Sequence, residues 1–162
     1  KHGNYDQWIM DDVLNAVIQT VPNATTNSNV YLSGLSMGGY GALRLGVKYS
    51  DKVKGISAHS SITQLDEINK FTDTDLSHYQ CENEQEHNIL YWLDKNKATL
   101  PPLRFDCGKD DILYQGNLTF KKALETADIR FSFDAFDGEH AWEYWHEHIQ
   151  QTFSFFTHIE QK

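Results

Sequence analysis

The most informative segment of the sequence is Gly34-Leu35-Ser36-Met37-Gly38, which fits the pattern G-x-S-x-G. An apolar strand is predicted before it, at 30–33, and a helix after it, from residue 37. In that context the serine occupies a tight strand-to-helix turn and projects its hydroxyl above the sheet as a nucleophile. The backbone N–H of Met37, at the helix start, can stabilise an oxyanion. The alternative is a glycine-rich turn without catalysis.

A serine nucleophile needs a base and an acid, which in this arrangement follow it in the order Ser, acid, His. His140 follows the last predicted strand, and the pair Asp110-Asp111 follows the strand before it. The carboxyl ends of parallel strands meet at one edge of a sheet, so these side chains can converge on Ser36. Position does not choose between Asp110 and Asp111, one of which is expected to cap the segment that follows.

The chain has eight histidines, and position selects His140 among them. His146, His148 and His158 fall in the last predicted helix, where we expect them on a solvated face. A metal site from His140, His146 and His148 is disfavoured, because His140 and His146 do not share a helix face and no carboxylate completes the ligands. Asp106 lies within a strand and is expected to face away. We predict no metal and no cofactor, since the reaction needs only water as second substrate.

The elements that position these residues follow from hydrophobic patterning. Helices are predicted at 8–21, 37–49, 86–95, 113–127 and 140–159, and strands at 30–33, 53–58, 103–107 and 129–136. This order indicates a parallel α/β sheet of about four strands with helices on both faces. Alternation over 129–136 places that strand at or near a sheet edge. The inward stripe expected of the last helix is Trp142, Trp145, Ile149, Phe153, Phe156 and Ile159.

The length of 162 residues suits a single domain, residues 1–162. Residues 60–102 are the least regular part and are interpreted as an excursion over the strand ends, because they are too short and too polar to bury a core of their own. Phe71, Tyr79, Tyr91 and Trp92 within it are candidates for the wall of a substrate pocket, with core packing as the alternative.

Composition excludes several classes of protein. Aromatic residues make up 13% of the chain, which excludes a disordered protein. The formal net charge of −9 argues against binding to nucleic acid or to an anionic membrane surface. No apolar run is long enough to span a bilayer. Cys81 and Cys107 do not form a disulfide framework, and the cellular compartment stays open.

Three segments resemble the esterase family of α/β-hydrolases that includes esterase D (S-formylglutathione hydrolase), tributyrin esterases, and feruloyl and acetylxylan esterases. They are 34–43, 107–114 and 138–145, around the serine, the acidic pair and the histidine. The resemblance implies Ser36 as nucleophile, His140 as base and Asp111 as acid. It implies a serine esterase that hydrolyses short-chain or sugar-linked acyl esters through an acyl-enzyme. We also predict that Leu35 and Trp142 take part in substrate binding.

Family members carry further strands and a second oxyanion donor upstream, so the chain is similar to the C-terminal two-thirds of a member. We therefore expect a partial α/β-hydrolase fold whose N-terminal strands are missing. An uncovered sheet edge would invite pairing with a second copy of the chain, which makes a homo-oligomer one expectation.

Two alternatives to the esterase stay open. A non-catalytic α/β domain would bind carbohydrate or take part in assembly, with Trp142 and Trp145 as stacking surfaces, although their helical spacing also suits core packing. Acyl transfer to an alcohol, as in the mycolyltransferase relatives, would use the same three side chains with a different acceptor.

Overall fold

The computed structural model describes residues 4–73, 75 and 83–161, in a chain that divides into two compact units, 1–30 and 31–162. Tyr79 and Cys81 lie outside the described residues. In the first unit, α1 (Tyr5–Gln7), η1 (Trp8–Val13) and α2 (Leu14–Thr20) form one continuous helical run. It begins before the predicted helix 8–21 and ends one residue earlier. Val21 is extended, as expected of a residue before proline.

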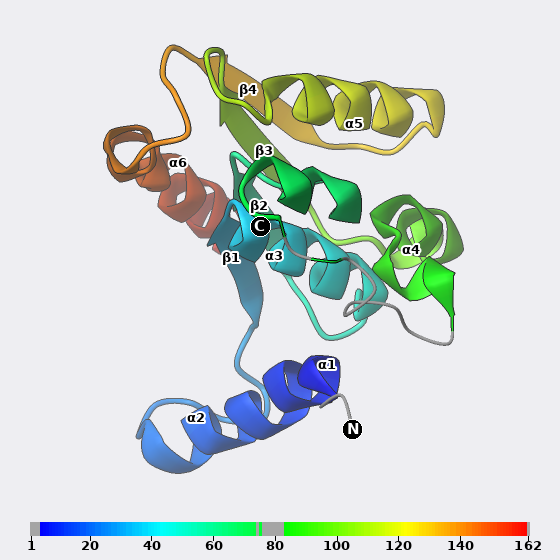
Figure 1. Ribbon diagram of the computed structural model, residues 1–162. Coiled ribbons are helices and arrows are strands. Elements are labelled where there is room, and N and C mark those ends of the chain that lie inside the picture. The colour runs from blue at the N-terminus through cyan, green and yellow to red at the C-terminus, as the bar shows by residue number, and fades with distance from the viewer. Residues whose placement is uncertain (1–3, 74, 76–82, 162) are drawn as a thin grey trace. The chain divides into compact units, whose positions relative to one another are not determined.

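The second unit is built on a parallel sheet with the strand order β1-β2-β3-β4 (Figure 1). The strands are β1 (Tyr31–Leu35), β2 (Gly55–His59), β3 (Leu103–Gly108) and β4 (Ser132–Phe136), so every predicted strand is present with shifted ends. β2 and β3 are buried along their whole length, whereas β1 and β4 are partly exposed. β4 ends the strand order, which confirms the edge position predicted from its alternation.

Helices cover both faces of this sheet, as predicted, because alternate residues of a strand point to opposite sides. Ile56 of β2 packs against Gly46 of α3 (Met37–Lys48), and α5 (Tyr114–Thr126) packs against β3. The neighbouring Ser57 points the other way, to Thr152 of α6 (Trp142–Glu160). Figure 1 shows α6 on one side of the sheet, with α3 and α5 on the other.

The segment between β2 and β3 contains η2 (Leu65–Lys70), η4 (Glu84–His87), α4 (Ile89–Lys95) and η5 (Lys97–Thr99). α4 falls within the predicted helix 86–95, packs on α3 and buries Ile89 and Leu93. The side chain of Asn96 donates a hydrogen bond to the carbonyl of Val47 at 2.7 Å. The segment therefore closes the C-terminal end of α3.

The face that α6 turns to the sheet matches the predicted apolar stripe only in part: Trp145 is buried, and Ile149, Phe156 and Ile159 are half-buried. Trp142 and Phe153 are 72% and 64% exposed, whereas Tyr144 and His148 are buried. The expectation that His148 lies on a solvated face is wrong, since its ring stacks on that of Phe136 with centroids 4.2 Å apart. The reason is that the sheet below α6 carries polar side chains, which favour polar partners. Within the described ranges no helix, α6 included, is both long and apolar enough to cross a membrane.

A buried polar network joins this face of the sheet to α6. The Asp106 carboxylate accepts hydrogen bonds from Arg104 at 2.6 Å and from the Tyr144 hydroxyl at 2.9 Å, and it lies 2.8 Å from His59 Nδ1. The other ring nitrogen of His59 is 2.6 Å from Oγ1 of Thr152. Burial by itself raises the pKa of Asp106, but its contacts with His59 and Arg104 outweigh burial and hold the pKa below its ordinary value. The buried carboxylate therefore stays charged.

Replacement of Arg104 by Met tests this network. The variant leaves the Asp106 carboxylate buried without its cation, so we expect the free energy of unfolding to fall by about 3–5 kcal/mol. Urea unfolding followed by circular dichroism measures the change. Arg130→Met, at an exposed arginine, is the control and should stay within about 0.5 kcal/mol of the parent. A loss below about 1 kcal/mol for Arg104→Met would contradict this account.

Candidate active site

Ser36 occupies a sharp turn between β1 and α3. Its backbone has φ 53° and ψ −120°, a conformation that costs free energy for any residue but glycine. Two backbone hydrogen bonds hold the turn: the Ser36 N–H donates to the His59 carbonyl at 3.0 Å, and the Ser36 carbonyl accepts from the Ile62 N–H at 3.2 Å. Both partners lie at or just beyond the end of β2, so the neighbouring strand supports the strained residue.

The turn also depends on a close approach of its glycines. A Cβ atom at Gly34 would lie 2.2 Å from the carbonyl oxygen of Gly38, well inside van der Waals contact. The strand and the helix can approach so closely only because Gly34 has no side chain. Met37 is the first residue of α3, and N–H groups in the first turn of a helix have no partner within the helix. The Met37 N–H therefore lies next to Ser36 without a role in the helix.

The structure brings His140 and Asp111 to Ser36. His140 Nε2 lies 3.0 Å from the Ser36 Oγ, and His140 Nδ1 lies 3.0 and 2.9 Å from the two carboxylate oxygens of Asp111. Asp110, the other acid that the sequence offers, is exposed, whereas Asp111 is buried. The carboxylate beside the imidazole is therefore that of Asp111.

The acid and the imidazole come from two loops that are bonded to each other. The Lys109 N–H, after β3, donates to the Phe136 carbonyl at the end of β4, at 2.8 Å. Gly108 allows close contact between the loops, since a Cβ atom there would lie 2.2 Å from the carbonyl oxygen of Gly138. These contacts fix the distance between the carboxylate and the imidazole before any ligand binds.

The negative charge of Asp111 is stabilised although its side chain is buried. Burial raises the pKa of a carboxyl group, but hydrogen bonds from His140 and from the Leu113 N–H, at 2.7 Å, outweigh burial here and hold the pKa of Asp111 below its ordinary value. The carboxylate can therefore accept the Nδ1–H of His140. That tautomer leaves the lone pair of Nε2 directed toward Ser36.

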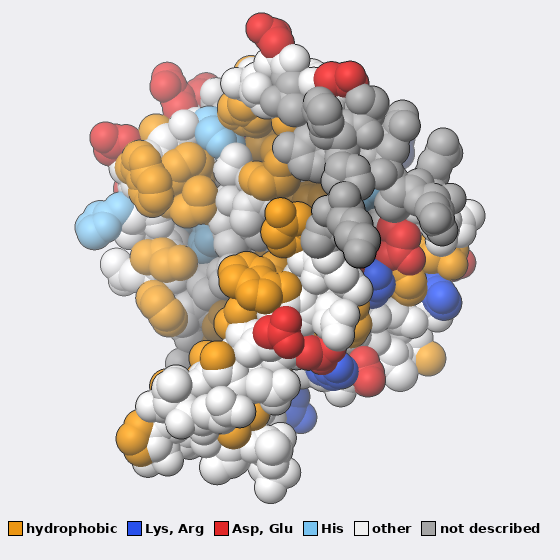
Figure 2. Space-filling view, turned by 60° about the horizontal axis from the view of Figure 1, so that its bottom comes forward, with side chains coloured by type: hydrophobic (Ala, Val, Ile, Leu, Met, Phe, Trp, Pro, Cys, Tyr) orange, Lys and Arg blue, Asp and Glu red, His pale blue; other side chains and the backbone are white. Residues whose placement is uncertain are grey.

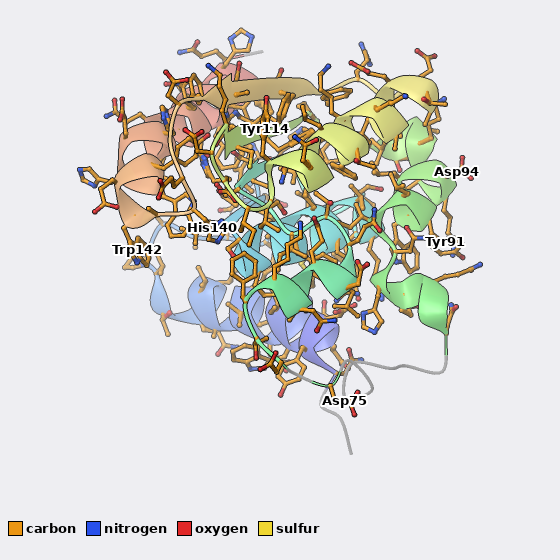
Figure 3. All side chains as sticks on the ribbon, turned by 45° about the horizontal axis from the view of Figure 1, so that its top comes forward. Asp75, Tyr91, Asp94, Tyr114, His140 and Trp142 are labelled. Carbon is orange, nitrogen blue, oxygen red and sulfur yellow. The ribbon has the colours of Figure 1, made fainter. Side chains whose placement is uncertain are left out.

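Aromatic rings surround the imidazole of His140. Phe71 packs against it with ring centroids 4.8 Å apart and planes inclined by 35°, and Trp145 meets it edge to face at 4.9 Å. Trp142 in turn meets Trp145 at 5.2 Å. Figure 3 shows Trp142 close to His140, at the start of α6. Four rings therefore form one run beside the serine.

Sequence patterning did not identify the network of His59 and Asp106, nor the contact of Phe71 with His140. The sequence did contain a signal for the polar network: polar residues alternate with apolar ones along β2 and β3, although both strands are buried throughout. No sequence pattern predicts the contact between Phe71 and His140, because the two residues are far apart in sequence. Asp106 takes part in the buried network and not in the contacts of Ser36 and His140.

Residues 1–156 match the family model described as "Putative esterase". The chain belongs to this family. An acetyl esterase from Caldicellulosiruptor saccharolyticus is 25% identical, over 98% of this chain and 66% of the relative. An S-formylglutathione hydrolase from Staphylococcus aureus is 28% identical with a TM-score of 0.81, over 93% of this chain and 63% of that structure. A ferulic acid esterase is 26% identical with a TM-score of 0.76, over 96% of this chain and 61% of that structure.

The chain thus spans less than two thirds of the length of these family members, as the 66%, 63% and 61% coverages show. Their similarity confirms the predicted fold, a partial α/β-hydrolase fold with a four-stranded parallel sheet.

Substitution of Gly34 by Ala tests the close approach in the turn. The new Cβ would overlap the Gly38 carbonyl, so we expect a loss of at least about 2 kcal/mol in the free energy of unfolding. Gly41→Ala is the matched control: it lies in α3, has no atom within 4 Å of the added Cβ, and should be stabilised by up to about 1 kcal/mol. Urea unfolding of both variants measures the difference. Equal effects would contradict the described geometry.

The lowered pKa of Asp111 predicts how stability depends on pH. A carboxyl group whose folded-state pKa lies below its unfolded value of about 3.9 stabilises the fold above that pH, and this stabilisation is lost as the pH falls through the folded-state pKa. We expect the urea concentration at the midpoint of unfolding to decrease as the pH is lowered below about 4. The decrease should be smaller in Asp111→Asn. Asp110→Asn, at the exposed neighbour, should keep the acid dependence of the parent. An Asp111→Asn profile parallel to that of the parent would refute the assignment.

Proposed function

We propose that the chain carries the nucleophile, base and acid of a serine esterase, with Ser36, His140 and Asp111 in these roles. The observation that supports this most is the 3.0 Å contact of His140 Nε2 with the Oγ of a serine whose φ is 53°. Backbone strain of this kind is concentrated at functional sites. A serine that merely ended a strand would need neither the strain nor the imidazole.

In the proposed acylation, the Ser36 Oγ attacks the carbonyl carbon of the ester while His140 Nε2 takes the hydroxyl proton. The Met37 N–H stabilises the negative charge that forms on the carbonyl oxygen. When this intermediate collapses, the bond between the carbonyl carbon and the alcohol oxygen breaks, and His140 gives its proton to that oxygen. The acyl group remains on Ser36. Asp111 accepts the Nδ1–H throughout and stabilises the imidazolium.

In the proposed deacylation, water takes the place of the alcohol. His140 removes a proton from water as its oxygen attacks the acyl carbon, and the bond to Ser36 then breaks. The proton passes from His140 to the Ser36 Oγ, which restores the free site and releases the carboxylic acid. The proposed reaction involves no metal and no cofactor.

We propose short-chain or sugar-linked acyl esters as substrates. Relatives named acetyl esterase and ferulic acid esterase support this class. Leu35 and Trp142 are the proposed substrate contacts. Leu35 is half-buried at the end of β1, directly before Ser36, and Trp142 offers an indole ring that is 72% exposed. Both are available to a ligand bound at the serine.

A fluorophosphonate probe tests the proposal. It should add to Ser36, as mass spectrometry of the labelled peptide would show, and labelling should disappear in Ser36→Ala. Hydrolysis of p-nitrophenyl acetate should fall by about 10⁴-fold or more in the same variant. Ser154→Ala, at an exposed serine of α6, is the control and should keep both properties. A folded chain that leaves Ser36 unlabelled would overturn the proposal.

Product analysis separates the esterase from its alternatives. With a competing alcohol present, free acid as the main product supports hydrolysis, whereas a new ester would favour acyl transfer. Carbohydrate binding that survives Ser36→Ala, with no ester turnover in the parent, would favour a non-catalytic domain.

A further inference from the structure

We propose that Phe71 forms the wall against which the alcohol part of the ester lies, and that it favours alcohols with an apolar ring face. This inference rests on the proposed function, because it assigns one side of that site to one half of the substrate. It makes Phe71 a specificity-determining residue and gives the irregular segment after β2 a role in recognition.

Phe71 contacts the histidine but is not buried by it. Its ring centroid lies 4.8 Å from that of His140, and 45% of the residue is exposed. An aromatic ring that served only as core would be more fully covered. Figure 2 shows several groups of apolar side chains that remain at the surface. A phenyl ring that touches the imidazole and still presents almost half of its area is a surface that a ligand can cover.

The segment that leads to Phe71 is held by hydrogen bonds at Glu67 and Lys70. The buried Glu67 accepts hydrogen bonds from the N–H and the hydroxyl of Thr63, at 2.8 and 2.9 Å. Lys70 Nζ donates to the carbonyl of Ile112 at 3.2 Å, one residue beyond the proposed acid. The backbone before Phe71 is therefore held in place, and the ring itself packs on His140, which lowers the entropic cost of using it as a binding surface.

The chemistry of the proposed reaction places the alcohol on this side. His140 Nε2 gives its proton to the alcohol oxygen, so that oxygen must come within hydrogen-bond reach of the imidazole. The carbon atoms bonded to it then lie next to the imidazole, where Phe71 already lies. The acyl carbon bonds to Ser36 instead. The alcohol leaves before water enters, so Phe71 should act on acylation alone.

An aromatic wall discriminates among alcohols by the apolar area that they present. A benzyl group, or the C–H face of a pyranose, can pack flat on a phenyl ring, whereas an ethyl group covers little of it. Trp142 continues the run of rings through Trp145 and offers a second surface to a larger alcohol. The net charge of −9 disfavours anionic esters. The substrate class that fits is a neutral ester of a ring-bearing alcohol.

Three acetate esters test the inference: ethyl acetate, benzyl acetate and a mono-O-acetyl pyranoside. For each ester, kcat/KM of Phe71→Ala is divided by that of the parent, so that the intrinsic reactivity of the ester cancels. We expect the ratio to fall about three- to tenfold for the two ring-bearing esters and to stay within about twofold for ethyl acetate. Phe71→Tyr should restore the parent's values. The decay of acetylated Ser36, followed by quenched-flow mass spectrometry, should be unchanged in both variants.

Phe153→Ala is the matched control, since it removes a phenyl ring that is 64% exposed on α6, and it should leave all three ratios near one. Circular dichroism and urea unfolding check that each variant is folded. An equal loss for all three esters, no loss for any, or slower decay of the acetyl-enzyme would overturn the inference while leaving the proposed function intact. Absence of acetylated Ser36 in the parent would overturn the proposed function and the inference with it.

Discussion

The strained turn at Ser36 is the constraint on which the rest of the site depends. A serine with φ 53° persists only where its surroundings hold it, and here the His59 carbonyl and the Ile62 N–H do so. Because both belong to the end of β2 and the chain just after it, the serine is tied to the sheet. Gly34 contributes by the absence of a side chain, which lets α3 begin directly above β1.

The polar network under α6 positions the histidine from the other side. Tyr144, in the first turn of α6, donates its hydroxyl to the buried Asp106 of β3. A Cβ atom at Gly138 would lie 2.8 Å from the Tyr144 ring, so the loop before His140 lies directly on that ring. Burial, and then the negative charge of Asp106, raise the pKa of Tyr144, so the hydroxyl remains a donor at all ordinary pH values. We infer that the network fixes the position of α6 on the sheet. Burying its charged groups costs desolvation free energy that an apolar interface would not incur.

The irregular segment between β2 and β3 connects helices on one face of the sheet and also supplies an aromatic side chain beside His140. Directly after β2, Ser61 packs against Gly39 of α3 and accepts a hydrogen bond from Asn117 of α5 at 2.8 Å, which joins two helices on the same face of the sheet. Further on, the same segment carries Phe71 to the imidazole of His140. The described parts of this segment are therefore held by contacts with neighbours that are distant in sequence.

Local features could be predicted from the amino-acid sequence. The glycines around Ser36, the alternation of strands and helices, and the placement of His140 after the last strand follow from patterns within a few residues, and backbone sterics act over that range. The choice of Asp111 over Asp110 follows from the resemblance to known esterases, and in the structure it depends on which carboxylate faces inward.

By contrast, the burial of Tyr144 and His148 on α6, and the contact of Phe71 with the histidine, depend on elements that come together only in the folded chain. The spacing of Trp142 and Phe153 satisfies a helical stripe, yet both are exposed, whereas Tyr144 and His148 pack inward beside the predicted Trp145. The sheet opposite them presents Arg104 and Asp106, and charged groups without polar partners would be too costly to bury there. A helix buries the face that complements its neighbour, and that neighbour is known only once the chain is folded.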